Sequence, residues 1–211
     1  MIDLYSLCKN YGIGNHGVIH LGAHEGQEVH LYQSLGMQNI LFVEANPDVY
    51  HRLNANVSSF PNVRTANYAI TDRNGVVQFH VTTSDFCSSV LPLKTVTTNY
   101  PGIAEMYQIT IPSRTVDSLL AELHFSPADF KLLNMDIQGA ELLALQGAGG
   151  LLQHLDAITT EVNFEELYEG CVLIGQLDHF LSVYGFHRVE TVQYHPTWGD
   201  AFYVRGSLIG R

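Results

Sequence analysis

Short apolar runs alternate along this chain with stretches in which apolar residues recur every three or four positions. Helical spacing is seen over 27–35, for example, and Gly36 is placed to end that helix. Strands that alternate with helices are typical of an α/β protein with a mainly parallel sheet. The apolar runs predict strands at 18–21, 39–44, 63–66, 76–81, 109–111, 130–135 and 157–161, and further helices are expected at 116–123, 139–146 and 173–184.

The two ends of the chain are expected to extend this alternating core. Residues 3–10 predict a short helix within an N-terminal helical extension, 1–14. Residues 186–192 and 201–204 predict a hairpin, with 195–200 in its connection. Such a hairpin would give the sheet an antiparallel edge.

Residues 82–107 are the least regular segment, rich in Ser and Thr and interrupted by Pro92 and Pro101. Long irregular stretches in compact domains are usually functional, so we expect this one to be an irregular cover over the active site. No repeat, low-complexity linker or change in composition marks a boundary. We therefore expect residues 1–211 to form one domain.

Composition and charge restrict the classes of function. The chain has 211 residues, 46% of them hydrophobic, which is enough for a sizeable core. The formal net charge is −11, from 10 basic and 21 acidic residues, so we expect no nucleic-acid partner. No Lys or Arg occurs between Lys131 and Arg188. The acids in that stretch either form solvated helix faces or line a site for a cation or a polyhydroxylated ligand.

Cysteine usage and hydropathy indicate where the protein is found. Cys8, Cys87 and Cys171 have no metal-ligand spacing, and their odd number fits reduced thiols in a cytoplasmic protein. No apolar run approaches the roughly 18 residues of a membrane span, and no apolar stretch follows a basic start. We expect no membrane insertion and no secretory leader.

A glycine turn follows the first predicted strand. Gly22, Ala23 and Gly26 would let the backbone approach a ligand, although a plain tight turn would look the same. The turn lacks the G-x-G-x-x-G pattern of dinucleotide-binding folds, and Glu25 would repel a pyrophosphate. A ligand with a positive centre and no phosphate, such as S-adenosylmethionine, tolerates that carboxylate and can contact it.

An acidic residue ends the second predicted strand, 22 positions after Gly22. Glu44 there could accept hydrogen bonds from both hydroxyls of a ribose, with Ala45 beside it. A helix cap or a surface acid is the alternative. Asn67, which follows the third strand, is expected near the adenine by the same topology.

Further polar residues follow later strands. Asp136 closes the strand at 130–135 and is expected at the carboxyl edge of the sheet, where ligands of open α/β folds bind. Glu141 lies in the first turn of the next helix, where the helix dipole favours an acid. Glu161 ends an apolar strand and needs a partner if it is buried. His195 lies in the connection of the predicted hairpin.

Several separated motifs, taken together, resemble the FkbM-type S-adenosylmethionine-dependent methyltransferases, over roughly residues 15–205. The chain departs from the usual pattern at Gln138, where the family usually has an acid, and at His24, where it often has Asn. The resemblance rests on VIHLGAHEG (18–26), FVEANP (42–47), Ser88-Ser89, Lys131, DIQGAE (136–141), LQGA (145–148), TEVNFEELY (160–168), GF (185–186) and GDAFY (199–203).

The resemblance implies a Rossmann-like fold with a seven-stranded, mainly parallel sheet, an antiparallel C-terminal hairpin strand and helices on both faces. It also implies methyl transfer from S-adenosylmethionine to a hydroxyl of a small secondary metabolite or carbohydrate-like substrate. Holding the acceptor oxygen in line with the methyl supplies much of such catalysis, and a base assists it. The candidate bases are Asp136, Glu161 and His195.

A divalent cation held by Asp136, Glu161 and Asn163 would lower the pKa of an acceptor hydroxyl, but no spacing indicates one, and we predict no metal site. Ser88 and Ser89 are expected to cover the cofactor. Tyr168, Trp198 and 82–107 are expected to contact the substrate.

Two rival functions follow from the same residues. One is an NAD-dependent Rossmann oxidoreductase, which the missing third glycine disfavours. The other is a non-catalytic binding domain on the same fold, which the presence of both Glu44 and Asp136 disfavours.

Overall fold

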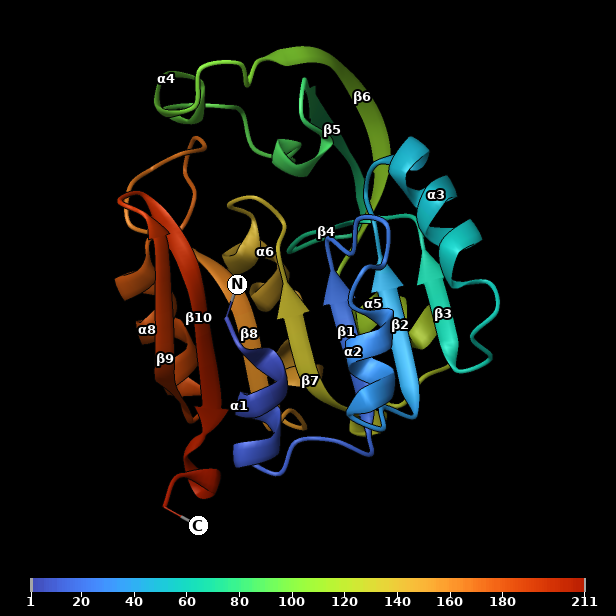
Figure 1. Cartoon of the computed structure of the whole chain (residues 1–211). Coiled ribbons are helices and arrows are strands. Elements are labelled where there is room, and N and C mark those ends of the chain that lie inside the picture. Colours follow the sequence, from blue (N-terminus) through green and yellow to red (C-terminus); the bar gives the residue numbers. More distant parts are fainter. Residues whose placement is uncertain (1, 211) are drawn as a thin grey trace.

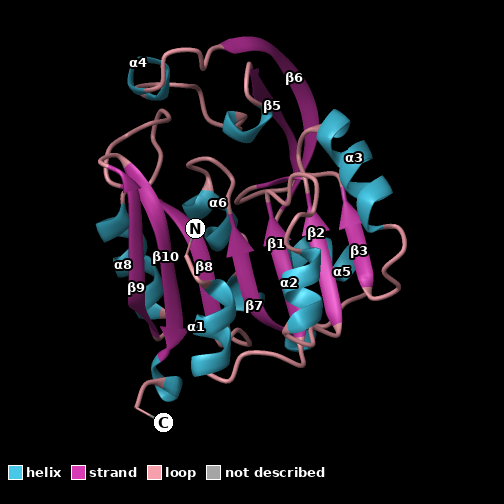
Figure 2. Cartoon of the chain, in the orientation of Figure 1, coloured by secondary structure: helices cyan, strands magenta, loops and turns pink. Residues whose placement is uncertain are grey.

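A seven-stranded sheet forms the centre of the molecule (Figures 1 and 2). The structure is a computed structural model that describes residues 2–210; residues 1 and 211, part of the expected single domain, lie outside the described residues. The sheet has the order β3-β2-β1-β7-β8-β10-β9. Its strands are β1 (Gly17–Leu21), β2 (Asn39–Val43), β3 (Val63–Ala66), β7 (Phe130–Met135), β8 (Ala157–Asn163), β9 (Phe186–His195) and β10 (Trp198–Arg205).

The predicted fold class is confirmed. The strands β3, β2, β1, β7 and β8 run parallel, whereas β10 is antiparallel to β8 and to β9. The connected helices are α1 (Leu4–Asn10), α2 (Val29–Ser34), α3 (Pro47–Val57), α5 (Val116–Glu122), α6 (Glu141–Gln146), α7 (Gly149–Leu152) and α8 (Ile174–Val183), and the short 3-10 turns η2 (Pro127–Asp129) and η3 (Gly206–Leu208) complete the connections.

Helices cover both faces of the sheet because successive strand residues point in opposite directions. Val18 of β1 packs into a cluster with α1, α2 and α3, whereas Ile19 and Leu21 pack into a second cluster with α5, α6, α7 and α8. All five residues of β1 are therefore buried. A central strand covered on both sides explains why the predicted strands read as continuous apolar runs.

A second, three-stranded sheet was not predicted. Its order is β4-β6-β5, formed by β4 (Ala69–Ile70), β5 (Gly75–Thr82) and β6 (Glu105–Arg114), and it arches over the top of the main sheet in Figure 1. The expected strand at 109–111 was too short, because residues 105–108 are exposed and lack an apolar alternation. They extend because they pair with β5 across the sheet.

The segment between β5 and β6 is less irregular than expected. It contains the 3-10 turn η1 (Asp85–Cys87) and the short helix α4 (Val96–Asn99). The C-terminal hairpin is also longer than predicted, so that His195 ends β9 and Trp198 begins β10 rather than both lying in a loop. Across residues 2–210, every helix is too short or too polar to cross a membrane.

Candidate active site

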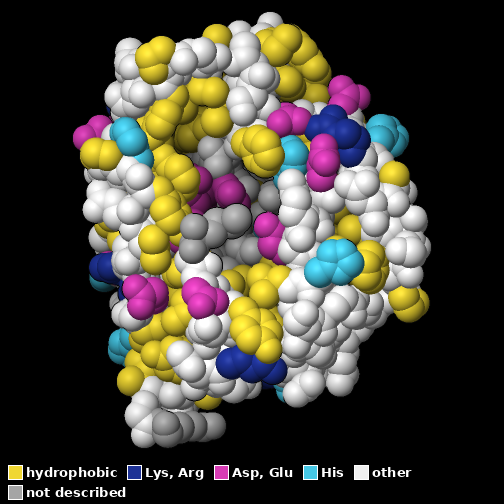
Figure 3. Space-filling model, viewed as in Figure 1, with side chains coloured by type: hydrophobic (Ala, Val, Ile, Leu, Met, Phe, Trp, Pro, Cys, Tyr) yellow, Lys and Arg dark blue, Asp and Glu magenta, His cyan; other side chains and the backbone are white. Residues whose placement is uncertain are grey.

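A cavity of about 640 Å³ opens at the carboxyl ends of β1, β2 and β7. Its volume is in the range of small-molecule sites. Figure 3 shows it as a hollow with acidic side chains inside and hydrophobic side chains around the rim. Its lining comes from the glycine turn, the ends of β2 and β7, the cover segment and the β9–β10 hairpin.

Gly22 allows two strand ends to meet. Its φ is +76°, and a Cβ built on it would lie 1.8 Å from the carbonyl oxygen of Asp136. This close approach puts the glycine turn and Asp136 side by side at the cavity wall. Position 26 requires glycine for a different reason, because a Cβ there would meet the side chains of Leu53 and Val57 of α3. Both glycines are thus required by packing within the protein.

Glu44 is held by the backbone on either side of the cavity. Its Oε2 accepts from the amide of His24 at 3.0 Å, and its Oε1 accepts from the amide of Asn46 at 2.8 Å. Burial raises its pKa, while these amides oppose the rise. Because each carboxylate oxygen has two lone pairs, one on each remains for a ligand in the cavity that Glu44 lines.

Asn67 supports this strand end from behind. Its Nδ2 donates to the carbonyl oxygens of Glu44 and Ala45, at 2.8 and 3.1 Å. Ala45 lines the cavity, but Asn67 does not. Asn67 therefore fixes the backbone beside Glu44 and does not itself line the cavity.

The cover is fastened to the glycine turn by η1. The His24 ring stacks on Phe86, with centroids 4.0 Å apart, and its Nε2 lies 3.3 Å from an oxygen of Asp85. Arg52 of α3 bridges Asp85, at 2.5 Å, and Glu25, at 2.6 Å. We call these five residues the clasp. Glu25 is thus occupied by an ion pair and does not line the cavity.

Gln138 joins the two strand-end carboxylates. Its Nε2 donates to Asp136 at 2.6 Å and to Glu161 at 3.0 Å, and its φ is +55°. Its Oε1 accepts from the hydroxyl of Tyr168 at 2.8 Å, and its carbonyl accepts from the hydroxyl of Ser89 at 2.8 Å. Gln138, one of the two departures from the FkbM-type pattern, is therefore the centre of a hydrogen-bond network.

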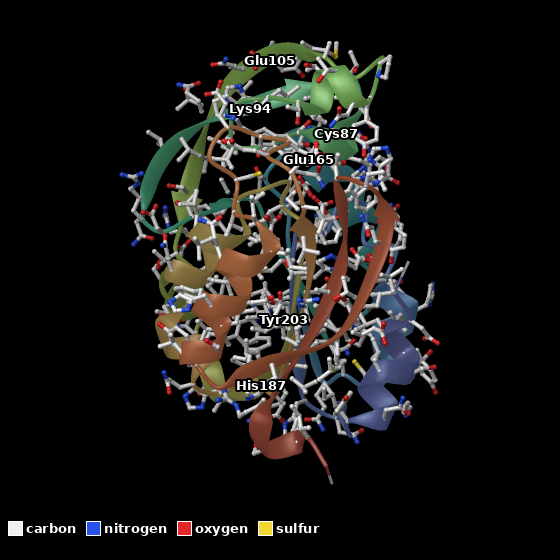
Figure 4. All side chains as sticks on the ribbon, turned by 90° about the vertical axis from the view of Figure 1, so that its left-hand side faces the viewer. Cys87, Lys94, Glu105, Glu165, His187 and Tyr203 are labelled. Carbon is white, nitrogen blue, oxygen red and sulfur yellow. The ribbon has the colours of Figure 1, made fainter. Side chains whose placement is uncertain are left out.

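These contacts connect β7 and β8 to the cover. The hydroxyl of Tyr168 also lies 3.0 Å from the carbonyl oxygen of Cys87, so its single proton is shared between this oxygen and Gln138. Figure 4 shows Cys87, Lys94 and Glu165 grouped at this upper end of the molecule, away from His187 and Tyr203. The cover is thus attached at the clasp and again at Gln138.

Burial raises the pKa of several carboxyls in the site. Asp136 is open to the cavity but enclosed by protein on its other sides, and this burial raises its pKa, with a further rise from the charge of Asp200. Burial also raises the pKa of Glu161, helped by the nearby charge of Asp136. Asp200, which accepts from the hydroxyl of Tyr194 at 2.8 Å, has its pKa raised in the same way. The site keeps several acids close together.

Glu141 and Asn163 are buried behind the cavity. The Oε1 of Glu141 accepts from the amides of Ile137 and Gly139, whereas its Oε2 has no hydrogen-bond partner among residues 2–210. Burial raises the pKa of Glu141. Asn163 is 1% exposed, and both of its side-chain polar atoms lack a partner within the same range.

The predicted site residues fall into three groups. The cavity is lined by Gly22, Ala23, Glu44, Ala45, Ser88, Asp136 and Trp198. Behind the lining lie Gly26, Asn67, Ser89, Glu161 and Tyr168. Two lie apart from it, Glu25 in the clasp and His195, whose ring packs against Tyr100 with centroids 5.0 Å apart and whose Nδ1 contacts Thr197 at 2.9 Å.

Some lining residues were missed. The cavity also contacts His20, Glu28, Tyr194 and Asp200, whereas Phe86 belongs to the segment 82–107 that was expected to cover it. Asp200 lies directly opposite Glu161 in the β8–β10 pairing, a relation that follows from strand register rather than from sequence spacing. Within the described part of the chain, no group of three His, Cys, Asp or Glu side chains is arranged to hold a metal ion.

Comparison with known proteins gives a family match over most of the chain. The model of the methyltransferase FkbM domain matches residues 20–188. The 2-O-methyltransferase NoeI of Sinorhizobium fredii (strain NBRC 101917 / NGR234) is 27% identical over 161 residues, which are 72% of this chain and 65% of that protein. The chain thus spans slightly less than two thirds of this relative.

Solved structures share the fold at low sequence identity. The methyltransferase FkbM of Methylobacillus flagellatus KT superposes with a TM-score of 0.59 at 13% identity, covering 90% of this chain and 43% of that one. A putative tRNA (m1A22) methyltransferase of Streptococcus pneumoniae gives 0.51 at 12% identity, covering 98% and 71%. Neighbours with such different names show the fold and leave the acceptor open.

Proposed function

This chain belongs to the FkbM methyltransferase domain family, and on that premise we propose that it transfers a methyl group from S-adenosylmethionine to a hydroxyl oxygen of a small or carbohydrate-like acceptor. The name of the NoeI relative, a 2-O-methyltransferase, supports oxygen as the receiving atom. The observation that carries the proposal is Glu44, a buried carboxylate at the cavity wall with one lone pair left on each oxygen.

The residues of the cavity fit this cofactor. Glu44 would accept from the two ribose hydroxyls, because its oxygens are already oriented by the amides of His24 and Asn46. The cavity is lined by four carboxylates and by no Lys or Arg among the described residues. This charge suits a cationic sulfonium and would repel the pyrophosphate of NAD, so we do not favour the oxidoreductase.

Asp136 is our candidate for the base. When bound, S-adenosylmethionine supplies an electrophilic methyl carbon. Asp136 faces the cavity, and its raised pKa makes it a better proton acceptor at neutral pH than an ordinary aspartate. It would take the proton of the acceptor hydroxyl as the oxygen forms its new bond to carbon and the bond from carbon to sulfur breaks.

Gln138 and the cover would position these groups. The Gln138 amide donates to Asp136 and Glu161 together and so fixes the orientation of both carboxyls. Phe86 and Ser88 would close the cavity against water from the cover side. His195 does not line the cavity, and we assign it no part in the reaction.

The test is calorimetric titration of S-adenosylhomocysteine into wild-type protein and Glu44→Gln. In this variant one carboxylate oxygen is replaced by an amide NH2 group, which cannot accept from the backbone amide of His24 or Asn46 and cannot accept from a ribose hydroxyl. We expect about 10- to 100-fold weaker binding, since a charge-assisted hydrogen bond contributes about 1.5–3 kcal/mol.

Glu190→Gln, on the exposed part of β9, is the matched control and should bind as the wild type does. A Glu44→Gln variant that is folded and binds with unchanged affinity would remove Glu44 from the site. Wild-type protein that does not bind S-adenosylhomocysteine at all would refute the proposed function.

A further inference from the structure

The cavity is longer than the nucleoside half of the cofactor site requires. Glu44 follows β2 and Asp200 lies in β10, four strands apart in the order β2-β1-β7-β8-β10. Neighbouring strands are about 4.8 Å apart, so these residues are separated by roughly 19 Å across the sheet. We call the part of the cavity beyond Asp136, formed by Tyr194, Trp198 and Asp200, the hairpin end.

The hairpin end combines carboxyls with aromatic rings on one face of the sheet. Asp200 lies opposite Glu161, and Trp198 lies opposite Asn163, in the antiparallel pairing of β10 with β8. Directly opposed residues, and residues two apart in a strand, point to the same face. The Trp198 and Tyr194 rings are 5.2 Å apart between centroids, beside the Tyr194–Asp200 hydrogen bond.

The described lining of the cavity is rich in carboxyls. The lining includes Glu28, Glu44, Asp136 and Asp200, and no Lys or Arg among the residues described. Glu44 is directed by two amides, and Asp136 lies next to the place expected for the sulfonium. The carboxyl of Asp200 accepts from the hydroxyl of Tyr194 at 2.8 Å and from the amide of Ile2 at 3.5 Å, and Glu161 lies on the same face.

Asn163 gives an independent indication of a missing polar partner. It is 1% exposed, lies on the same face of β8 as Glu161, and neither its amide nitrogen nor its amide oxygen finds a hydrogen-bond partner within residues 2–210. Buried amides without partners are costly and uncommon in folded proteins. Asn163 lies behind the lining at this end, so the polar side chains shared by β8 and β10 are incompletely paired next to the hairpin end.

We propose that the acceptor carries a protonated amine near its reactive hydroxyl, and that the hairpin end binds this ammonium group with Asp200, against the face of Trp198. This inference rests on the proposed function, because it assigns the acceptor to the part of the same cavity that the nucleoside would not occupy. An ammonium group supplies donors to carboxylates and is attracted to an indole face. A phosphate or carboxylate in its place would be repelled by Asp200 and Asp136, which both line the cavity.

The chain offers its own probe, because Trp198 is its single tryptophan. Fluorescence titrations at pH 7 on protein saturated with S-adenosylhomocysteine would compare three alcohols: glucamine, which is a cation, N-acetylglucamine, which is neutral, and sorbitol 6-phosphate, which is an anion. Calorimetry on the same samples confirms each binding constant. We expect glucamine to bind at least 10-fold more tightly than N-acetylglucamine, and the phosphate to bind least.

Asp200→Asn is the test variant, because an asparagine oxygen can still accept from Tyr194 and preserve the fold. It should reduce the preference for glucamine about 10-fold and leave S-adenosylhomocysteine binding within 3-fold. Asp72→Asn, in the turn between β4 and β5, is the control and should keep the full preference.

Several results would overturn the inference. One is N-acetylglucamine binding as tightly as glucamine or more tightly, a second is no binding of any of the three alcohols, and a third is an Asp200→Asn variant with an unchanged preference for glucamine. A fourth is Mg²⁺ binding that depends on Asp200 and is required for the alcohols to bind, which would assign the hairpin end to a metal ion. Because binding of S-adenosylhomocysteine is measured first, its failure would refute the proposed function separately.

Discussion

The contact between Gly22 and Asp136 allows a quantitative test of how the site is built. A Cβ at position 22 would lie 1.8 Å from the Asp136 carbonyl oxygen, whereas real Cβ contacts are essentially never shorter than 3.0 Å. In Gly22→Ala the end of β7 must therefore move by at least 1.2 Å, the difference between these two distances. The hydrogen bond from the Asp136 amide to the Leu21 carbonyl, 3.0 Å long, would be stretched or broken.

Three costs combine in this variant. Alanine in the left-handed region costs about 1–2 kcal/mol, overpacking costs about 1–3 kcal/mol, and a lost hydrogen bond costs about 1 kcal/mol. We expect the free energy of unfolding to fall by about 3–6 kcal/mol, a large part of the roughly 5–15 kcal/mol that folded domains have. Binding of S-adenosylhomocysteine should weaken as well, because Asp136 lines the cavity.

Urea unfolding followed by circular dichroism measures the change, with Gly175→Ala as the matched control. Gly175 lies in α8 with no atom within 4 Å of a built Cβ and no positive φ, so alanine there should stabilise the protein by about 0.5–1 kcal/mol. A loss below about 1 kcal/mol in Gly22→Ala would refute the argument that the glycine is needed for the strand ends to meet.

Two further substitutions test the polar residues that follow β7. Gln138→Met removes the donor shared by Asp136 and Glu161 and should lower the free energy of unfolding at pH 7 by about 2–4 kcal/mol. Urea titrations at pH 7 and pH 5 should show a smaller loss at pH 5, and an equal loss would count against ionised partners. Burial raises the pKa of Glu141 from 4.5 to about 7 in the native state. Between these values the native state binds more protons than the unfolded state, so the free energy of unfolding falls as the pH rises from 4.5 to 7. Glu141→Gln should flatten this slope in unfolding curves between pH 4.5 and 7, and an unchanged slope would contradict the assignment.

Much of the fold could be predicted because the central strands are covered on both faces. The continuous apolar run over 130–135 corresponds to β7 as observed, and the run over 18–21 differs from β1 by one residue. The second sheet could not be predicted, because the first four residues of β6 are exposed, show no apolar alternation and are extended by pairing with β5. The added residues of the C-terminal hairpin, 193–195 and 198–200, also show no apolar alternation and are extended by the pairing of β9 with β10.

The site was predictable where a residue directly follows a buried strand. Glu44 and Asp136 line the cavity, as their positions after β2 and β7 would require, although their roles in binding and catalysis remain predictions. Contacts between distant segments were not predictable. Gln138 meets Tyr168 and Ser89 through the packing of the cover, and no sequence spacing encodes those distances.

The clasp has a consequence for how ligands enter and leave. Arg52 is 44% exposed, and its two acidic partners are each 36% exposed, so dissolved salt can screen the ion pairs that hold η1 to the glycine turn. The stacking of His24 on Phe86 is not weakened in this way. Ionic strength should therefore change the residence time of a bound nucleoside more than its orientation against Glu44.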